Sequence, residues 1–185
     1  MKSDQILAEQ LNAVIAIGEA LSGAQLGLDA LFSRIVPEIS KLVHAERTTL
    51  FLIEKKRNEI WSKVAQGAEH TEIRLKIGEG IAGWVAQYNE AVSSQDPYND
   101  KRFNAEFDTF SGFKTRNLIA VPVLNKKGES IAVLQVLNLN QFPEQSLGLL
   151  KTIAAQTHYT IENAQLTQEL LEPQTPCCTN AYLEP

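Results

Sequence analysis

The residues best suited to chemistry lie in a glycine-rich segment near the middle of the chain. Residues 78–83 read Gly78-Glu79-Gly80-Ile81-Ala82-Gly83, which has the spacing G-x-G-x-x-G. A glycine-rich turn that enters a helix presents backbone N–H groups without partners, and such groups attract a phosphate or a carboxylate. The segment therefore predicts an anion cradle, or else a tight strand-to-helix turn that holds no ligand. A Cβ at Gly80 is expected to crowd this turn.

The same spacing occurs in dinucleotide-binding folds, but the context here differs. The strand before such a glycine motif is normally buried on both faces. Residues 71–77 instead alternate between charged and apolar side chains, which is typical of a strand with one wet face. No run of βαβ units follows. The sequence therefore argues against a dinucleotide site.

Other chemistries lack the side chains that they need. Cys177 and Cys178 are adjacent in a proline-rich tail, and two such residues build neither a zinc site nor a disulfide scaffold. His44, His70 and His158 are each isolated, and we expect them to be surface or packing residues and not haem ligands. Nothing resembles a catalytic triad. The sequence predicts no catalytic residue, no metal, no cofactor and no enzyme activity.

The amino-acid composition and net charge argue against certain classes of binding partner. The chain has 185 residues, 44% of them hydrophobic and 21% charged, with a formal net charge of −5. An acidic balance disfavours nucleic acid and anionic membrane surfaces, which select basic proteins. The apolar stretches are far shorter than the ~20 residues of a membrane-spanning helix, and the N-terminus has no signal-peptide pattern. We expect a cytoplasmic protein whose partners include neither nucleic acid nor a membrane.

Helical periodicity marks both ends of the chain. Residues 4–22 carry a narrow heptad-like seam, which predicts an amphipathic helix and, packed beside the last helix, a homodimer. A second helix starts near Leu28 and is expected to kink or restart at Pro37. A final helix is expected from about Pro143 to Leu171. We divide the chain into an N-terminal amphipathic helix (1–23), a central domain (24–168), and a helix end with a flexible tail (169–185).

The middle of the chain shows the two-residue periodicity that is typical of β-strands. Two runs joined by a polar turn, and two more joined by Asn125-Lys126-Lys127-Gly128, read as antiparallel hairpins. Residues 93–116 read as a long polar connection. Antiparallel strands with flanking helices make the fold class α+β. The expected strands are Thr48–Ile53, Ile60–Ala65, 71–77, Leu118–Val123 and Ile131–Leu137, with a short helix at Ile81–Gln87.

Four blocks in unbroken order resemble a GAF domain, above all the GAF domains of cyclic-nucleotide phosphodiesterases and cyanobacterial adenylyl cyclases. The blocks are Arg47–Leu52, Gly78–Ala86, Asp96–Phe103 and Thr115–Val123, and the resemblance spans roughly residues 25–168. It implies an antiparallel sheet of about six strands, with the N- and C-terminal helices packed on one face and a ligand pocket on the other.

The resemblance also implies a set of ligand-binding residues. The backbone N–H groups of Ile81 and Ala82 would hold a cyclic phosphate, while hydroxyl and amide side chains would bond a purine or ribose. Asp108 would bond the ligand from the long loop, and we expect it to matter little for the unliganded fold. The implied lining is Thr49, Ala65, Gln66, Ile81, Ala82, Asn104, Asp108, Ser111, Thr115 and Gln135.

The sequence departs from the nucleotide-binding pattern in two places. Binding members of the family often carry Asn-Lys after the last strand, then Phe and a later Asp-Glu pair, which are thought to brace the pocket. Here Leu139 follows Asn138, and Ser146-Leu147 stand where the acids would be. Ala65 is small where an aromatic ring would stack on a base.

Two functions follow from these observations. The first is a regulatory module that binds a small molecule, cAMP, cGMP or a similar ligand, and signals through its terminal helices to an effector domain or partner protein. The second is a GAF scaffold that binds no ligand and works by dimerisation or partner interaction. The domain body has no cysteine, which excludes a covalent bilin and cysteine-based sulfoxide reduction.

Overall fold

The computed structural model of the chain describes Ile15 and residues 28–64, 71–140 and 144–171. Within these ranges one antiparallel sheet has six strands in the order β3-β2-β1-β6-β5-β4. The strands are β1 (Ala45–Glu54), β2 (Glu59–Val64), β3 (Thr71–Lys76), β4 (Val92–Ser94), β5 (Leu118–Leu124) and β6 (Ser130–Leu139). The helices are α2 (Leu28–Leu42), α3 (Gly80–Tyr88), α4 (Glu106–Ser111) and α5 (Glu144–Leu171), with a short 3-10 turn η1 (Pro97–Asn99). The predicted α+β class is confirmed.

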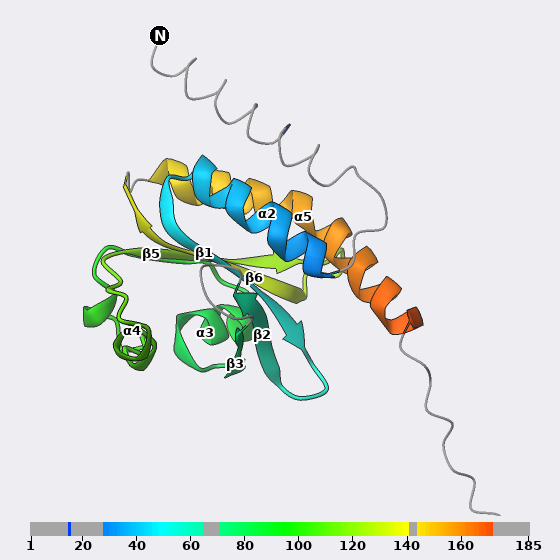
Figure 1. Ribbon diagram of the computed structural model, residues 1–185, viewed down its shortest axis with the longest axis horizontal. Coiled ribbons are helices and arrows are strands. Elements are labelled where there is room, and N and C mark those ends of the chain that lie inside the picture. The colour runs from blue at the N-terminus through cyan, green and yellow to red at the C-terminus, as the bar shows by residue number, and fades with distance from the viewer. Residues whose placement is uncertain (1–14, 16–27, 65–70, 141–143, 172–185) are drawn as a thin grey trace, which may run out of the picture.

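The long helices α2 and α5 lie together on one face of the sheet (Figure 1). Strand side chains alternate between faces, so every second residue of β1, such as Leu50 and Leu52, points at these helices. They pack against buried helical residues including Ile35 and Ile153. Full burial of each such side chain is worth about 1.5–3 kcal/mol. Pro37, expected to interrupt the second helix, lies inside α2, which continues to Leu42.

The other face of the sheet carries a second, smaller apolar cluster beneath α3. Phe51 of β1 and Ile60 of β2 meet Ile81 and Val85 of α3 there. Figure 1 shows α3 and α4 on this face, opposite the long helices. The sheet therefore separates a helix-covered face from a face on which a pocket can form.

The connection predicted as a long loop at 93–116 is partly ordered into elements. Val92 and Ser94 pair with Ala120 and Leu118, which makes β4 an edge strand beside β5. Helix α4 follows after η1. Three strand residues and six helical residues are too few to show a period, so sequence patterning missed both elements.

Several expectations concern residues that lie outside the described ranges. They include the helix at 4–22, with the dimer seam on it, and the tail with Cys177 and Cys178. These remain predictions. No helix in the described part of the chain is both long enough and apolar enough to span a membrane.

Candidate ligand pocket

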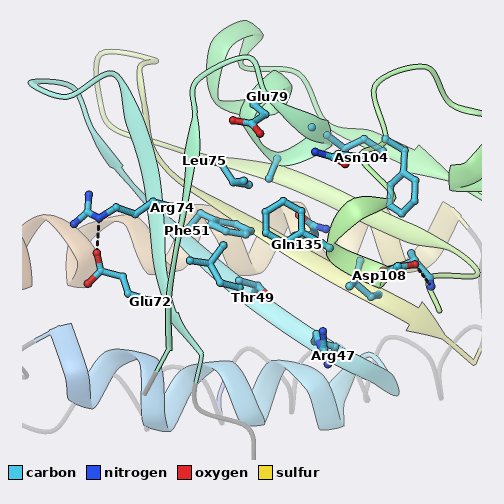
Figure 2. A pocket seen from close by; sticks show the side chains of 18 residues that line it. Arg47, Thr49, Phe51, Glu72, Arg74, Leu75, Glu79, Asn104, Asp108 and Gln135 are labelled. Atoms are coloured by element: carbon cyan, nitrogen blue, oxygen red, sulfur yellow. Dashed lines mark hydrogen bonds and ion pairs between the residues drawn. The ribbon is translucent and has the colours of Figure 1, made fainter. Parts of the chain in front are cut away.

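A cavity of about 510 Å³ opens on the face of the sheet opposite α2 and α5. Ligand pockets for small molecules typically measure ~300–1,000 Å³. Its floor comes from β1 and β6, one wall from β3 and the start of α3, and the other wall from α4 and the segments around it (Figure 2). The lining residues are Arg47, Thr49, Phe51, Glu72, Ile73, Arg74, Leu75, Glu79, Gly80, Ile81, Ala82, Phe103, Asn104, Phe107, Asp108, Thr115, Gln135 and Leu137.

The start of α3 forms the wall that was predicted as an anion cradle. Gly83 donates the first hydrogen bond to its preceding turn, at 3.1 Å from N to the carbonyl oxygen of Glu79. The N–H groups of Ile81 and Ala82 precede it and have no acceptor within the helix. Both residues line the cavity. This end of α3 can therefore hold an anion with backbone donors, without a lysine or arginine.

The two glycines of this turn, Gly80 and Gly83, differ from expectation in how much space each leaves for a side chain. A Cβ at Gly80 would meet nothing within 4 Å, although its φ of +64° is unfavourable for other residues. A Cβ at Gly83 would lie 2.6 Å from the carbonyl oxygen of Lys76. The expectation that a side chain at Gly80 crowds the turn is therefore wrong. The crowded position is Gly83, where α3 passes close to the end of β3.

The polar floor of the cavity consists of two neighbouring side chains. Thr49 of β1 and Gln135 of β6 are register partners, so both point to the same face of the sheet. Within the described part of the chain, neither side chain has a hydrogen-bond partner. Their hydroxyl and amide groups are therefore available to a ligand.

Asp108 occupies a different kind of position from the one expected. It lies in α4 and is only 8% exposed. Its Oδ2 accepts hydrogen bonds from Thr115 N at 2.6 Å and from the Tyr98 hydroxyl at 2.8 Å, and its Oδ1 accepts one from the Thr115 hydroxyl at 2.8 Å. The bond to Asp108 raises the pKa of Tyr98 above its ordinary value. The expectation that Asp108 is a loop carboxylate outside the core is wrong, because it lies buried in α4 and bonds Tyr98 and Thr115.

The structure brings seven of the ten predicted residues to one cavity: Thr49, Ile81, Ala82, Asn104, Asp108, Thr115 and Gln135. Asn104 also accepts a hydrogen bond at Oδ1 from Glu106 N, 2.9 Å away, at the start of α4. Ala65 and Gln66 lie outside the described residues, and Ser111 ends α4 with a side chain that the structure does not describe. That these residues bind a ligand stays a prediction.

Arg47 and Phe51 also line the cavity and were missed by sequence reasoning. They stand two residues to either side of Thr49, so strand alternation alone places them on its face. The Arg47 guanidinium lies 4.2 Å from the centroid of the Phe113 ring, a cation–π contact. The described residues offer Arg47 no acidic partner, whereas Arg74 pairs with Glu54, Glu59 and Glu72. Arg47 is therefore the lining cation that has no acidic partner among the residues that the structure describes.

The corner after β6, where the family's lysine and acids are missing, is braced by other groups. Asn138, at φ 55°, donates from Nδ2 to Glu46 Oε2 at 2.6 Å and to the Lys114 carbonyl oxygen at 2.9 Å. Its Oδ1 accepts a hydrogen bond from Arg116 N at 2.6 Å. Glu46 and Arg116 also form an ion pair, and hydrogen bonds from Arg116 and Asn138 lower the pKa of Glu46. The loop that enters β5 is thus tied to β1 and β6.

The antiparallel sheet, the helix pair on one face and the cavity on the other define an α+β domain with a pocket on one side of its sheet. The family model of the GAF domain matches residues 27–161. The chain belongs to the GAF domain family.

Curated relatives with clear similarity are cyclic-nucleotide phosphodiesterases. The chain is 31% identical over 160 residues to a cGMP-specific 3',5'-cyclic phosphodiesterase of Drosophila virilis, covering 77% of this chain and 18% of that protein. It is 33% identical over 156 residues to the dual 3',5'-cyclic-AMP and -GMP phosphodiesterase 11A of Takifugu rubripes, covering 76% of this chain and 17% of that protein. The chain therefore spans less than a fifth of each of these relatives.

Solved structures share the fold at lower identity. The GAF domain of a phosphoenolpyruvate-protein phosphotransferase from Coxiella burnetii matches with a TM-score of 0.77 at 18% identity, over 88% of this chain and 98% of that chain. A free methionine-R-sulfoxide reductase from Neisseria meningitidis, solved with its substrate, matches with a TM-score of 0.66 at 19% identity, over 82% and 87%. These likenesses establish the fold alone.

Proposed function

We propose that this chain is a regulatory GAF module that binds cAMP, cGMP or a similar small anion in the described cavity. The observation that carries the proposal is the pairing of two sets of groups around one apolar space. Backbone donors of Ile81 and Ala82 stand at one wall, and the floor is formed by the side chains of Thr49 and Gln135, which have no partner among the described residues. Similarity to phosphodiesterases that act on cyclic nucleotides supports the same ligand class.

The charged lining of the cavity consists of Arg47 and Arg74 with Glu72, Glu79 and Asp108, and Arg47 is the cation that we expect to meet an anionic ligand. Among the lining cations, Arg74 is neutralised by three glutamates, whereas Arg47 is not paired with an acid in the described part of the chain. A cyclic phosphate carries one negative charge, which suits a cradle of neutral N–H groups supplemented by one cation. Apolar side chains such as Phe51 and Leu137 supply the surface that a purine or ribose would bury.

We expect the effect of ligand binding to be transmitted to the opposite face of the sheet. Thr49 and Gln135 alternate along their strands with Leu50 and Leu134, which pack in the core beneath α2 and α5. A ligand that shifts β1 against β6 would therefore move the residues on which the long helices rest. We propose that these helices pass the change to an effector domain or partner protein, in a cytoplasmic homodimer, and that the chain itself catalyses no reaction.

The alternative is a GAF scaffold that binds no ligand. The corner after β6 favours it, because Glu46, Arg116 and Asn138 order this region without any ligand. Leu139 and Ser146 stand where the nucleotide-binding pattern has a lysine and an acid.

Thermal unfolding with and without cyclic nucleotides tests the proposal. At ~100 times its dissociation constant, a ligand that binds only the folded state stabilises it by about 2.7 kcal/mol. We expect a clear rise in melting temperature with cAMP or cGMP and matching heat by calorimetry. If both nucleotides at millimolar concentration leave the melting temperature unchanged, the scaffold function replaces this one.

A further inference from the structure

The wall of the cavity formed by residues 104–112, called here the lid segment, has little support of its own. Its helix α4 has six residues, too few for an isolated helix to be stable in water. Figure 1 shows α4 standing apart from the sheet. The segment has defined ends, since Asn104 Oδ1 accepts a hydrogen bond from Glu106 N at the start of α4 and Gly112 follows the helix with φ +65°. Its position therefore depends on the bonds that tie it to the rest of the domain.

Hydrogen bonds to Asp108, called here the tie, are the main polar contacts that hold α4 in place. Three hydrogen bonds reach the Asp108 carboxylate, two from Thr115 and one from Tyr98. A carboxylate offers about four acceptor sites, so the protein itself uses most of them. Figure 2 shows Asp108 on the α4 side of the cavity, away from the groups at the start of α3.

Thr115, which donates two of these hydrogen bonds, is itself held in place by the sheet. It is buried three residues before the start of β5, and the residues on both sides of it are bonded to β6. Asn138 of β6 donates to the carbonyl oxygen of Lys114 and accepts from the N–H of Arg116. Hydrogen bonds from β6 thus fix the two neighbours of Thr115, and Thr115 in turn donates to Asp108 of α4.

We propose that Asp108 is a positioning residue that holds α4 against Thr115 and so keeps this wall of the cavity in place, setting the rate at which a ligand leaves. The tie itself does not depend on the nature of the ligand, whereas the effect on ligand release rests on the proposed function. A role in direct ligand contact, as the family resemblance implies for Asp108, would leave the lid segment in place when the carboxylate is altered.

Hydrogen exchange of the ligand-free protein tests the tie directly. Asp108→Asn keeps the size of the side chain but replaces one acceptor oxygen with a donor. Exchange in residues 105–116 should become about tenfold faster, the scale of one lost hydrogen bond to a charged group. Glu106→Gln removes the same charge from an exposed site on the same helix and should change nothing. Unchanged exchange in Asp108→Asn would overturn the proposal.

Tyr98→Phe separates positioning from contact and guards against a variant that fails to fold. Tyr98 is 50% exposed and is not among the cavity-lining residues, but its hydroxyl donates to Asp108. Loss of this hydroxyl should also loosen residues 105–116 while β1, β5 and β6 keep their protection. If only Asp108→Asn has an effect, and it raises exchange equally across the sheet, Asp108 is a general core residue and the proposal fails.

Ligand release supplies the functional readout. With a fluorescent cyclic nucleotide as the probe, both Asp108→Asn and Tyr98→Phe should speed dissociation several-fold, and the double variant should add little to the larger single effect. Faster release in Asp108→Asn with wild-type release in Tyr98→Phe would instead indicate direct contact and overturn the proposal. If no cyclic nucleotide binds the wild-type protein, the proposed function fails, and the exchange experiment still decides whether Asp108 holds the lid segment.

Discussion

The two faces of the sheet are made by the same strands and differ in how they are held. The helix face is an apolar core in which residues such as Leu50, Leu134 and Ile153 are buried against α2 and α5. The pocket face has a smaller apolar cluster beneath α3, and beside it a cavity whose outer wall is tied by polar bonds such as those of Asp108. Close packing tolerates little change in volume, whereas hydrogen-bonded loops open at lower cost. The difference indicates that the helix face carries most of the stability of the domain and that the pocket face can change its conformation at lower cost.

The largest expected effect comes from a cavity in the helix face. Leu50→Ala should lower the free energy of unfolding by about 2–5 kcal/mol, the usual cost of truncating a buried leucine. Affinity of the remaining folded protein for a cyclic nucleotide should stay close to wild type, because Leu50 points away from the cavity. Denaturant titration and calorimetry measure the two quantities. A loss of affinity without a loss of stability would contradict the division between the faces.

A smaller loss of stability is expected at the turn that leads into α3. In Gly83→Ala the new Cβ would lie 2.6 Å from the carbonyl oxygen of Lys76, so α3 must shift, at about 1–3 kcal/mol for overpacking. Gly80→Ala is the matched control, since it meets no neighbour and carries only the strain of its positive φ. Melting temperatures should rank wild type, then Gly80→Ala, then Gly83→Ala. The reverse order of the two variants would show that Gly80 is the tighter position.

On the pocket face, a floor substitution should change binding more than stability. Gln135→Leu removes an amide that has no partner within the described residues and leaves a side chain of similar size. Affinity for a cyclic nucleotide should fall about two- to tenfold, the worth of one hydrogen bond of ~0.5–1.5 kcal/mol. The unliganded melting temperature should hold or rise slightly. Unchanged affinity would remove Gln135 from the site.

The smallest effect concerns the corner brace and its pH dependence. Hydrogen bonds from Arg116 and Asn138 lower the pKa of Glu46 in the folded state. A carboxylate with a depressed folded pKa stabilises the fold above its unfolded pKa, and the contribution is lost as pH falls through the folded value. Glu46→Gln should therefore flatten slightly the fall in melting temperature below about pH 4.3, the ordinary value for glutamate. Identical pH profiles for the two proteins would mean that this exposed pair contributes nothing.

Local patterns predicted much of the fold. Alternation at 71–77 predicted β3, and the polar turns between apolar runs predicted both hairpins, because side-chain period and turn preference are properties of neighbouring residues. Four motif blocks in order implied the family, and with it the sixth strand and the side of the sheet that holds the pocket. The edge strand β4 and helix α4 were not predicted from pattern, since each is shorter than the stretch over which a period can be recognised.

The amino-acid sequence by itself determined the fold class, the family and seven of the residues that meet at the cavity, because these depend on periodicity and on motifs read along the chain. Only the tertiary structure decided what those residues do there. Asp108 bonds Tyr98 and Thr115, ten and seven residues away, and Gly83 is required by the carbonyl oxygen of Lys76. Such contacts depend on how a loop and a helix pack against the sheet. Packing is set by the whole domain, so spacing along the chain does not reveal it.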